Sequence, residues 1–311
     1  MKHLVLGSRG SKLALWQTEY VASQLKKAVP GLEVEIKTIK TKGDKILDVA
    51  LSRIGDKGLF VKEIEKELLN GSIDMAVHSM KDLPSELSPG LMIGAVLKRE
   101  NSQDVLISRL GLKLQDLPEG AVIGTSSLRR IAQLRALRPD IRTVDIRGNV
   151  ETRIRKMQEE KMDGIVLAYA GVKRLGFEEL ISDYLPHKLV LPAVGQGAIA
   201  VEIRAGDSEN NKLAQKINHE NSFLAIQAER SFLRILQGGC QVPIGCYAYI
   251  EEGNLVIEGL IASLDGQRVF RGINKGSIRQ AEQIGQQLAK ELLHNGADKV
   301  LDEIREAGDK S

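Results

Sequence analysis

The sequence predicts an α/β fold of two lobes with parallel-rich sheets, followed by a C-terminal α+β domain. In the first part of the chain, short apolar runs alternate with amphipathic helices, which is the βαβ pattern of parallel sheets covered by helices. The same alternation restarts after a polar stretch at 99–103. The last third differs, because a helix is followed by three strands and two further helices.

The elements of the first lobe follow from apolar periodicity and from the residues that end each run. We expect helices at about 11–28 and 59–70, the second ended by Gly71. The expected strands lie at 3–7, 33–39, 73–77, 91–97 and, later in the chain, 198–203. The Gly-rich segment 191–197 is interpreted as a hinge or crossing segment.

The second lobe and the C-terminal domain are assigned in the same way. The expected strands are 104–108, 121–124, 141–146 and 164–168, with helices at 127–138 and 149–161. The C-terminal domain has helices at 221–237, 277–294 and 297–307 and strands at 246–251, 254–262 and 267–273. Ligands of such folds bind in a cleft at the carboxyl ends of the strands.

Composition limits the function classes. The 311 residues are 42% hydrophobic and 27% charged, as in ordinary globular proteins, and the net charge of +3 gives little support for nucleic-acid binding. Cys240 and Cys246 form neither a disulfide framework nor a zinc pattern, so a reducing compartment fits best and no metal is expected. With no signal-peptide or membrane-span pattern, we expect a cytoplasmic protein that does not bind membranes.

Arginine is concentrated in one segment. Residues 125–155 contain eight arginines and no lysine. Arginine recognises carboxylate and phosphate groups in a planar, bidentate manner, so the segment indicates an anion site. The alternative is a solvated basic helix face, which would normally mix lysine with arginine.

The motif GTSSLRR, at 124–130, follows a predicted strand and opens a predicted helix. The hydroxyls of Thr125, Ser126 and Ser127 can cap the helix, and its free N–H groups favour an anion. Arg129 and Arg130 add two guanidinium groups. The alternative is an ordinary N-cap followed by surface arginines.

Two further strand ends carry arginine. Arg147 precedes the Gly148–Asn149 turn, and Arg153 shares a helix face with Asn149, so both can reach the same crevice. Near the N-terminus, Arg9 and Ser11 follow a strand and open a helix. Arg9 could equally be a surface residue at a helix start.

The motif HSMKDLP places Asp82 after a buried strand, beside Lys81 and before Pro84. A carboxylate near cations and partly desolvated can hold a proton or stabilise a developing cation. The alternative is an aspartate that supports a Pro-terminated turn. We interpret His78 as structural.

Cys240 lies in the Gly-rich turn LQGGCQVPIG, at 236–245, directly after an amphipathic helix. Glycines before it and a proline after it keep the sulfur off regular structure, as in a thiol presented to a ligand. The alternative is a small buried hydrophobe near a turn. No phosphate-binding loop, dinucleotide fingerprint or Ser-His-Asp set is present.

Together these motifs resemble the porphobilinogen deaminase (hydroxymethylbilane synthase) family. The similarity runs nearly end to end, through SRGSKLALWQ, KGLFVKEIE, DMAVHSMKDLP, GTSSLRR, RGNVETRI, AGVKRLG, LPAVGQGAIAVE and ERSFLRILQGGCQVPIG. The resemblance implies three domains, of which the first two are like periplasmic-binding-protein lobes. It divides the chain into a discontinuous domain 1 (1–98 and 196–218), domain 2 (99–195) and domain 3 (219–311), and it implies a monomer.

The resemblance also implies the chemistry. A dipyrromethane cofactor would be attached to Cys240 by a thioether, and four porphobilinogen molecules would be added one at a time, each losing ammonia. Water would then release the linear tetrapyrrole hydroxymethylbilane, in tetrapyrrole (haem) biosynthesis. Asp82 would be the catalytic residue that assists ammonia loss and stabilises the cationic azafulvene.

The roles of the remaining residues follow from the same resemblance, because each pyrrole brings an acetate and a propionate. The implied cofactor-binding residues, besides Cys240, are Lys81, Ser127, Arg129, Arg130 and Arg147. The implied substrate-binding residues are Arg9, Ser11, Arg153 and Arg174. Cys246 is interpreted as structural, and a flexible active-site loop falls near 42–58.

Two other classes of function are compatible with parts of this pattern. A non-catalytic anion-binding protein of two-lobe architecture would also carry helix N-termini and arginines, but the third domain and the Cys240 turn count against it. A nucleic-acid binder using 125–155 is disfavoured by the 4% aromatic content and the lack of a recognised motif.

Overall fold

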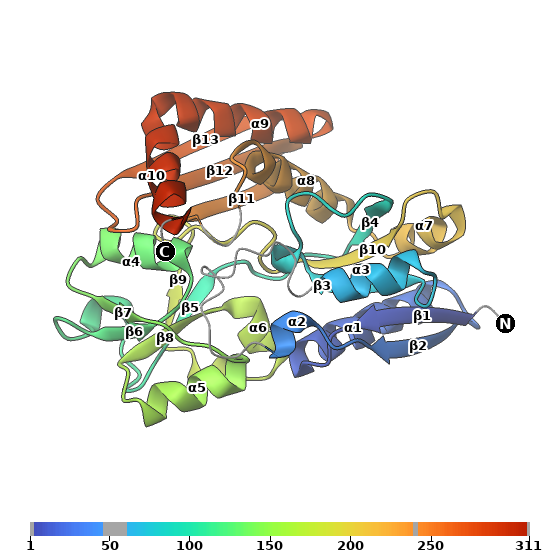
Figure 1. Cartoon of the computed structure of the whole chain (residues 1–311), viewed down its shortest axis with the longest axis horizontal. Coiled ribbons are helices and arrows are strands. Elements are labelled where there is room, and N and C mark those ends of the chain that lie inside the picture. The colour runs from blue at the N-terminus through green and yellow to red at the C-terminus, as the bar shows by residue number, and fades with distance from the viewer. Residues whose placement is uncertain (1–2, 46–60, 239–241, 310–311) are drawn as a thin grey trace. The chain divides into compact units, whose positions relative to one another are not determined.

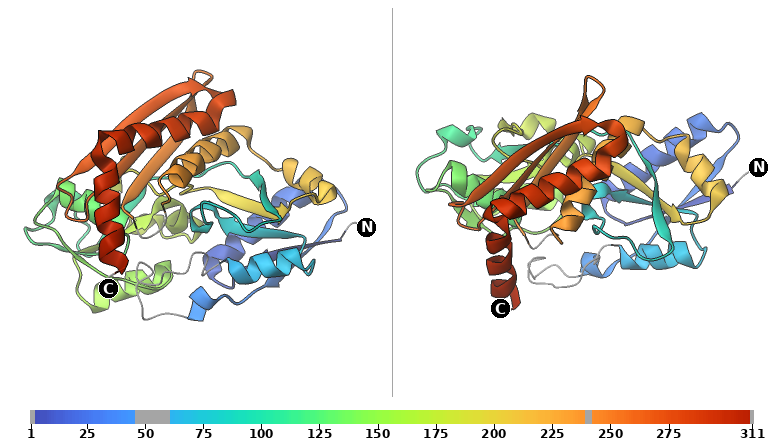
Figure 2. Two further views of the ribbon diagram at one scale, coloured as in Figure 1. Left: turned by 45° about the horizontal axis from the view of Figure 1, so that its top comes forward. Right: turned by 90° about the horizontal axis from the view of Figure 1, so that it is seen from above.

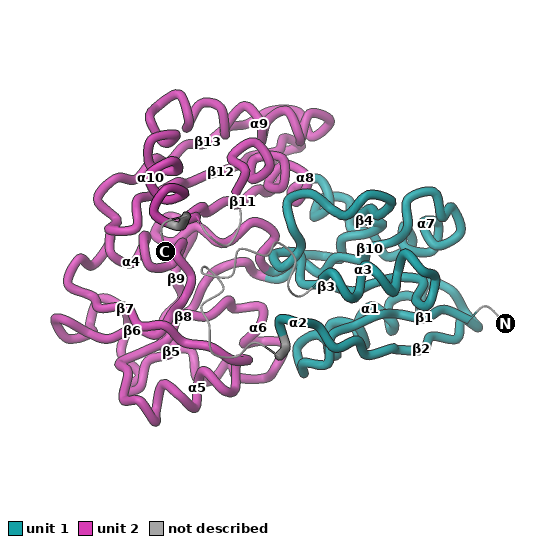
Figure 3. Tube along the Cα trace, in the orientation of Figure 1, with its two compact units in different colours: residues 1–47, 56–100, 197–224 teal, residues 48–55, 101–196, 225–311 magenta. Residues whose placement is uncertain are grey.

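A computed structural model describes residues 3–45, 61–238 and 242–309 of the chain (Figure 1). The chain divides into two compact units, coloured separately in Figure 3. Unit 1 comprises residues 1–47, 56–100 and 197–224, and unit 2 comprises residues 48–55, 101–196 and 225–311. The second lobe and the C-terminal domain therefore share one unit by this division, and the three-domain boundaries stay a prediction.

Unit 1 is built on a five-stranded sheet with the strand order β2-β1-β3-β10-β4. Strands β1 to β4 run in one direction, and β10 is antiparallel to both of its neighbours. Since β10 is the strand that follows the return of the chain from unit 2, no crossover helix fixes it parallel to its neighbours. The strands are β1 (His3–Ser8), β2 (Glu33–Thr38), β3 (Met75–Ser79), β4 (Leu91–Val96) and β10 (Ile199–Arg204).

Helices cover both faces of this sheet. On one face, Leu6 and Met75 share a core cluster with Val21 and Leu25 of helix α1. On the other face, Ile64 of helix α3 packs in a separate cluster. The helices of unit 1 are α1 (Lys12–Ala28), α2 (Lys42–Lys45), α3 (Lys62–Leu69) and α7 (Ser208–Gln215).

Unit 2 contains a second five-stranded sheet, with the order β7-β6-β8-β5-β9. Here too one strand is reversed, because β5 is antiparallel to β8 and β9, whereas β6, β7 and β8 are parallel. The strands are β5 (Asp104–Ser108), β6 (Val122–Gly124), β7 (Arg142–Val144), β8 (Gly164–Ala168) and β9 (Asp183–Leu185). The helices around it are α4 (Leu128–Leu137), α5 (Val150–Glu159) and α6 (Tyr169–Arg174).

The rest of unit 2 is an antiparallel sheet of strands β11, β12 and β13, along which helix α9 lies (Figure 2). Glycine allows this close packing: a Cβ on Gly259 would meet the Phe232 ring at 2.6 Å. The bounds are α8 (Glu220–Ile235), β11 (Ile244–Glu251), β12 (Asn254–Ala262), β13 (Val269–Ser277), α9 (Ala281–Leu292) and α10 (Asp298–Asp309).

The α/β class is confirmed, and both five-stranded sheets are parallel-rich as expected. The sequence reasoning missed α6, α7 and β9, since elements of three to eight residues show too little periodicity to be recognised. The predicted helix over 277–294 begins only at Ala281, because residues 278–280 form a 3-10 turn. Among the helices in the described part of the chain, none combines the length and apolar character needed to span a bilayer.

Candidate active site

The first group of predicted site residues lies at one edge of the unit 1 sheet. Strands β1 and β3 are parallel neighbours, with Leu6 opposite Met75, so their carboxyl ends meet at the same edge. Arg9 directly follows β1, and Lys81 and Asp82 belong to the 3-10 turn that follows β3. The sheet therefore brings Arg9, Ser11, Lys81 and Asp82 to one edge of unit 1.

Hydrogen bonds fix this edge. Ser11 is the N-cap of α1, and its hydroxyl accepts a hydrogen bond from the backbone N–H of Ala14 at 3.3 Å. One turn further along α1, the amide of Gln17 donates to the Ser79 hydroxyl at 2.9 Å, and that hydroxyl donates back to the Gln17 amide oxygen at 3.1 Å. The start of α1 is thus attached to the end of β3.

Asp82 is exposed, not partly desolvated as the sequence suggested. It ends a short 3-10 turn whose apolar residues, Met80 and Leu83, point into the core and leave the carboxylate outside. In the described part of the chain, no hydrogen bond or ion pair engages this carboxylate. It is therefore accessible to a ligand at the strand end.

His78 is buried, and its Nε2 lies 3.0 Å from Glu202 Oε2 on the neighbouring strand β10. Both side chains are inside the sheet, away from solvent. This placement agrees with the structural interpretation of His78.

The second group lies at the corresponding edge of the unit 2 sheet. Strands β6, β7 and β8 are parallel, and their carboxyl ends lead to Ser127, to Arg147 and to helix α6, which ends at Arg174. Arg153 is on α5, which begins just after Arg147. The second sheet therefore collects Ser127, Arg147, Arg153 and Arg174 at one edge of unit 2.

The three hydroxyls of GTSSLRR have different roles. Ser126 joins two strand ends, because its hydroxyl accepts from the Ile146 N–H at 3.0 Å and donates to the Ile146 carbonyl at 3.1 Å. Thr125 is buried and accepts from the Ser127 N–H at 3.3 Å. Ser127 is the N-cap of α4, but its side chain makes no capping hydrogen bond. Its hydroxyl is available to a ligand.

Arg129 and Arg130 are buried, not displayed at the surface. Asp104, the first residue of β5, is fully buried and lies between them. Arg129 Nη1 donates to Asp104 Oδ2 at 2.8 Å, and Arg130 Nη2 donates to Asp104 Oδ1 at 2.7 Å. Burial alone would raise the pKa of Asp104, but the charges and hydrogen bonds of the two guanidinium groups outweigh it and hold that pKa well below its usual range.

Backbone carbonyls complete this cluster. Arg129 Nη1 also donates to the Leu191 carbonyl at 2.6 Å, and Arg130 Nη1 donates to the Val166 carbonyl at 2.8 Å. Gln196 of the crossing segment donates to Asp104 Oδ1 at 2.8 Å. Both guanidinium groups are therefore held by acceptors inside the fold through their Nη atoms, while the Nε of each is buried without a partner among the described residues. Their assignment to the cofactor stays a prediction.

Arg147 differs from these two arginines. Arg129 and Arg130 each leave only a buried Nε without a hydrogen-bond partner, whereas Arg147 leaves two buried nitrogens, Nε and Nη2, without one among the described residues. Burial lowers the pKa of the Arg147 guanidinium, and nearby Asp145 opposes that shift only in part. Two buried donors without acceptors fit a carboxylate of a bound ligand, which would satisfy both of them.

Arg153 is oriented by the turn after β7. Its Nε donates to the Gly148 carbonyl at 2.8 Å. Gly148 has a φ of 117°, which favours glycine, and Asn149 caps α5 by accepting from the Thr152 N–H at 2.8 Å. This turn therefore sets the direction of Arg153 next to Arg147.

Cys240 lies outside the described residues, as does most of the predicted loop at 42–58, of which only 42–45 is described. The chain on either side of Cys240 is described. A Cβ on Gly238 would meet the side chains of Leu233 and Ile244 at 2.5 and 2.7 Å, so this position requires glycine. Cys246 is a free, buried thiol on β11, which agrees with its structural interpretation.

Sequence reasoning missed three fully buried acids, Asp104, Glu202 and Glu229. Asp104 could have been found from its position, because it is a carboxylate at the start of an otherwise apolar strand. A carboxylate buried in such a strand requires a buried cation as its partner. Glu229 on α8 accepts from the backbone N–H groups of Gly195 and Ala248, each at 2.7 Å. It thereby ties the crossing segment to β11, and nothing local in an amphipathic helix indicates that role.

Solved structures give only weak similarities. The chain resembles the methionine-binding protein MetQ with a TM-score of 0.43 and 13% identity, covering 71% of this chain and 92% of that one. It resembles the VFT2 domain of BvgS from Bordetella pertussis with a TM-score of 0.42 and 16% identity, covering 70% and 86%. Similarities at this level support no conclusion about function.

Sequence relatives are much closer. The chain is 64% identical to the porphobilinogen deaminase of Syntrophomonas wolfei, over 98% of this chain and 100% of that protein. It is 57% identical to the porphobilinogen deaminase of Carboxydothermus hydrogenoformans, over 98% of each chain. The relative in Moorella thermoacetica, with the same name, is 53% identical over 98% and 97%.

Two family models cover most of the chain. The model described as "Porphobilinogen deaminase, dipyromethane cofactor binding domain" matches residues 4–212. The model described as "Porphobilinogen deaminase, C-terminal domain" matches residues 223–294. The chain therefore belongs to the porphobilinogen deaminase family of enzymes, and it contains the dipyrromethane cofactor-binding domain of that family.

Proposed function

We propose that this enzyme condenses four porphobilinogen molecules, with loss of ammonia, into the linear tetrapyrrole hydroxymethylbilane. Family membership supports the reaction. The structural observation that supports a carboxylate-bearing substrate is the environment of Arg147. Arg147 has two buried donor atoms without acceptors among the described residues, and each unsatisfied buried donor destabilises a fold by about 1–3 kcal/mol. An anion bound at Arg147 would remove this cost. A pyrrole that carries acetate and propionate supplies such an anion.

The residues at the edge of the unit 2 sheet offer the guanidinium and hydroxyl donors that the carboxylates of a dipyrromethane cofactor would require. When bound through a thioether to Cys240, this group supplies the pyrrole carbon to which new units are joined. Arg147 and the hydroxyl of Ser127 would hold its carboxylates, with Lys81 contributing a further charge. Arg129 and Arg130 would contribute their positive field from within the fold, unless their side chains turn away from Asp104.

The remaining roles concern the incoming substrate. Arg9, Ser11, Arg153 and Arg174 would bind its carboxylates. Asp82 would stand beside the reacting ring, where its exposed carboxylate stabilises the positive charge that develops as ammonia leaves. We further propose that the protein is a cytoplasmic monomer that binds neither nucleic acid nor membranes.

The intact mass of the purified protein tests the cofactor assignment. The wild type should carry an excess mass that fits two linked pyrroles, and Cys240→Ser should lack it, because serine forms no thioether. Cys246→Ala is the matched control: it removes the other, buried thiol and should keep the excess mass. If Cys240→Ser kept both the excess mass and full activity, the proposed attachment would be wrong.

Asp82→Asn tests the catalytic assignment. The substitution keeps the shape of the side chain but removes its charge, so bound cofactor should remain while the turnover rate falls at least about a hundredfold. Glu86→Gln removes an exposed charge four residues further along and should leave the rate nearly unchanged. Near-normal turnover of Asp82→Asn, measured by ammonia release, would remove Asp82 from this role.

A further inference from the structure

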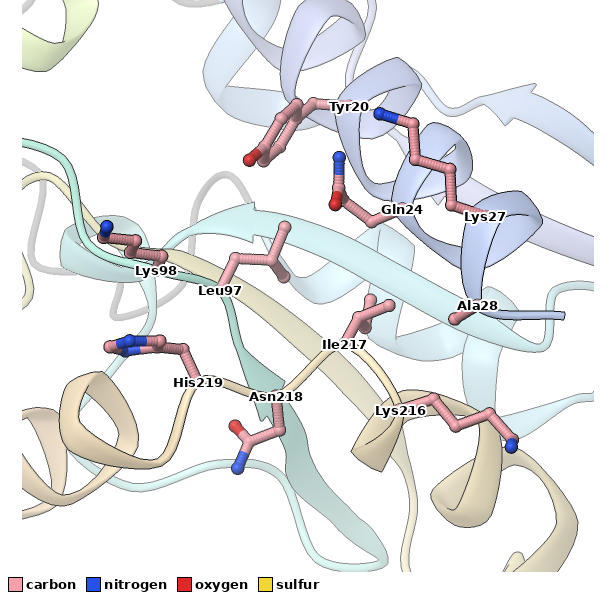
Figure 4. A pocket seen from close by; sticks show the side chains of 10 residues that line it. All are labelled: Tyr20, Gln24, Lys27, Ala28, Leu97, Lys98, Lys216, Ile217, Asn218 and His219. Atoms are coloured by element: carbon pink, nitrogen blue, oxygen red, sulfur yellow. The ribbon is translucent and has the colours of Figure 1, made fainter.

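Unit 1 contains a pocket that includes none of the predicted site residues (Figure 4). Its volume is about 390 Å³, and it is formed by the second half of α1, the end of β4 and the segment between α7 and α8. The lining includes Tyr20, Gln24, Lys27, Leu97, Lys98 and His219.

The lining carries basic side chains and no acidic ones. For Lys27 and Lys98, no hydrogen bond or ion pair is formed within the part of the chain that the structure describes. In Figure 4, Tyr20 and Gln24 extend from α1 toward Leu97 and Lys98, whereas Lys216 points away from them. Lys27 also complements the dipole at the end of α1, but Lys98 follows a strand and has no such role.

His219 adds a hydrogen-bond donor to the pocket, and neighbouring groups determine which ring nitrogen of its imidazole carries the proton. The backbone N–H of Ser222 donates to His219 Nδ1 at 3.2 Å. The Ser222 hydroxyl accepts from the Arg99 N–H at 2.9 Å, so its own proton is directed to His219 Nδ1, 2.9 Å away. Since Nδ1 accepts, the ring proton is on Nε2, which can donate to a ligand in the pocket.

We propose that this pocket binds a small, multiply charged oxyanion, either a carboxylate or a phosphate. Two ammonium groups, the imidazole Nε2–H, the Tyr20 hydroxyl and the Gln24 amide offer donors, while Leu97 and Ile217 supply apolar contact. The volume suits a ligand of metabolite size, at the small end of the usual range of about 300–1,000 Å³. The site does not depend on the proposed catalytic roles.

The fluorescence of a tryptophan in this chain can report ligand binding to the pocket. Trp16 is the single tryptophan of the sequence, and its ring stacks on that of Tyr20 with centroids 5.4 Å apart. A ligand that contacts Tyr20 should therefore change the emission of Trp16. Because no other tryptophan contributes, the signal comes from α1. Since Ser11 of the proposed substrate site caps the start of α1, the comparison with Lys27→Gln/Lys98→Gln assigns the response to this pocket.

The experiment titrates the full-length protein with citrate, inorganic phosphate and acetate at constant ionic strength, and follows Trp16 emission and binding heat. Citrate or phosphate should give a saturable response, and whichever binds more tightly identifies the ligand class. In Lys27→Gln/Lys98→Gln the affinity should fall at least about fivefold, as expected for the loss of two exposed charge contacts. Lys26→Gln is the matched control, since Lys26 is the exposed neighbour that does not line the pocket.

His219→Asn separates binding from folding, because asparagine can still cap α8 but lacks the Nε2 donor. It should weaken binding without changing the free energy of unfolding. The proposal is overturned by an equal response to acetate, by no saturable response in the wild type, or by unchanged affinity in Lys27→Gln/Lys98→Gln.

Discussion

The two five-stranded sheets have equivalent topologies, yet each neutralises a buried acid in its own way. In each sheet the reversed strand lies next to the edge strand and carries a fully buried carboxylate, Glu202 on β10 and Asp104 on β5. In unit 1 the partner is His78, a group that can lose its charge. In unit 2 the partners are Arg129 and Arg130, which are permanently charged.

This difference teaches that an arginine-rich motif need not be a binding motif at every position. Two arginines of the segment 125–155 hold Asp104 and backbone carbonyls inside the sheet. Arg147, in the same segment, forms no such ion pair in the described part of the chain, and both its Nε and its Nη2 are buried without partners there. We expect the first kind to contribute mainly to folding and, under the proposed function, the second mainly to binding; substitutions can separate the two.

The largest effect is expected for Asp104→Asn. It leaves two buried guanidinium groups without a countercharge, and removing one partner of a buried ion pair costs about 3–5 kcal/mol in the free energy of unfolding. Urea denaturation measures this loss. Glu159→Gln is the control, since it breaks the exposed Arg155–Glu159 pair and should cost at most about 0.5 kcal/mol.

The same variant has a pH signature. Because the folded pKa of Asp104 lies below its ordinary value of 3.8, the cluster stabilises the protein fully above that value and loses its contribution as the pH falls further. The stability of the wild type should therefore decrease more steeply below about pH 4 than that of Asp104→Asn. Equal slopes would mean that Asp104 is not the acid that the two arginines stabilise.

Arg147→Leu should have a smaller effect, and on binding instead of folding. Loss of a charged hydrogen-bond donor costs about 1.5–3 kcal/mol, so porphobilinogen turnover or cofactor loading should fall about 10- to 100-fold. The free energy of unfolding should stay constant or increase, because unsatisfied buried donors are removed. Arg155→Leu, at an exposed position on α5, should change neither quantity. An unchanged product profile for Arg147→Leu would refute the binding role.

Glu202→Gln should give the smallest effect. The amide can still hydrogen-bond His78, and no permanent charge is left unpaired, so the free energy of unfolding should decrease by about 1–2 kcal/mol. Thermal or urea unfolding measures it beside Asp104→Asn. If the two substitutions destabilised the protein equally, the contrast between a permanent and a titratable partner would not explain the two sheets.

By itself, the sequence determined the α/β class and the positions of most strands and helices. Strands and helices are recognised by the periodicity of their apolar residues. The strands at 3–7 and 104–108 and the helix over 11–28 show this periodicity clearly. The sequence also determined which residues follow strand ends, so the two edge groups around Asp82 and Arg147 could be predicted from the carboxyl-end rule. The motifs in order along the chain were sufficient to indicate the family.

Only the tertiary structure decided which of these residues are free to bind. Arg129 and Arg147 look alike in sequence, but Arg129 donates to Asp104, 25 residues away along the chain, whereas the buried Nε and Nη2 of Arg147 have no partner among the described residues. The tertiary structure alone also revealed that Glu229 bridges Gly195 and Ala248. It likewise revealed that strands β5 and β10 are reversed. Such pairings form between segments that are distant in the sequence. The local sequence therefore does not determine whether a side chain is paired within the fold or remains available to a ligand.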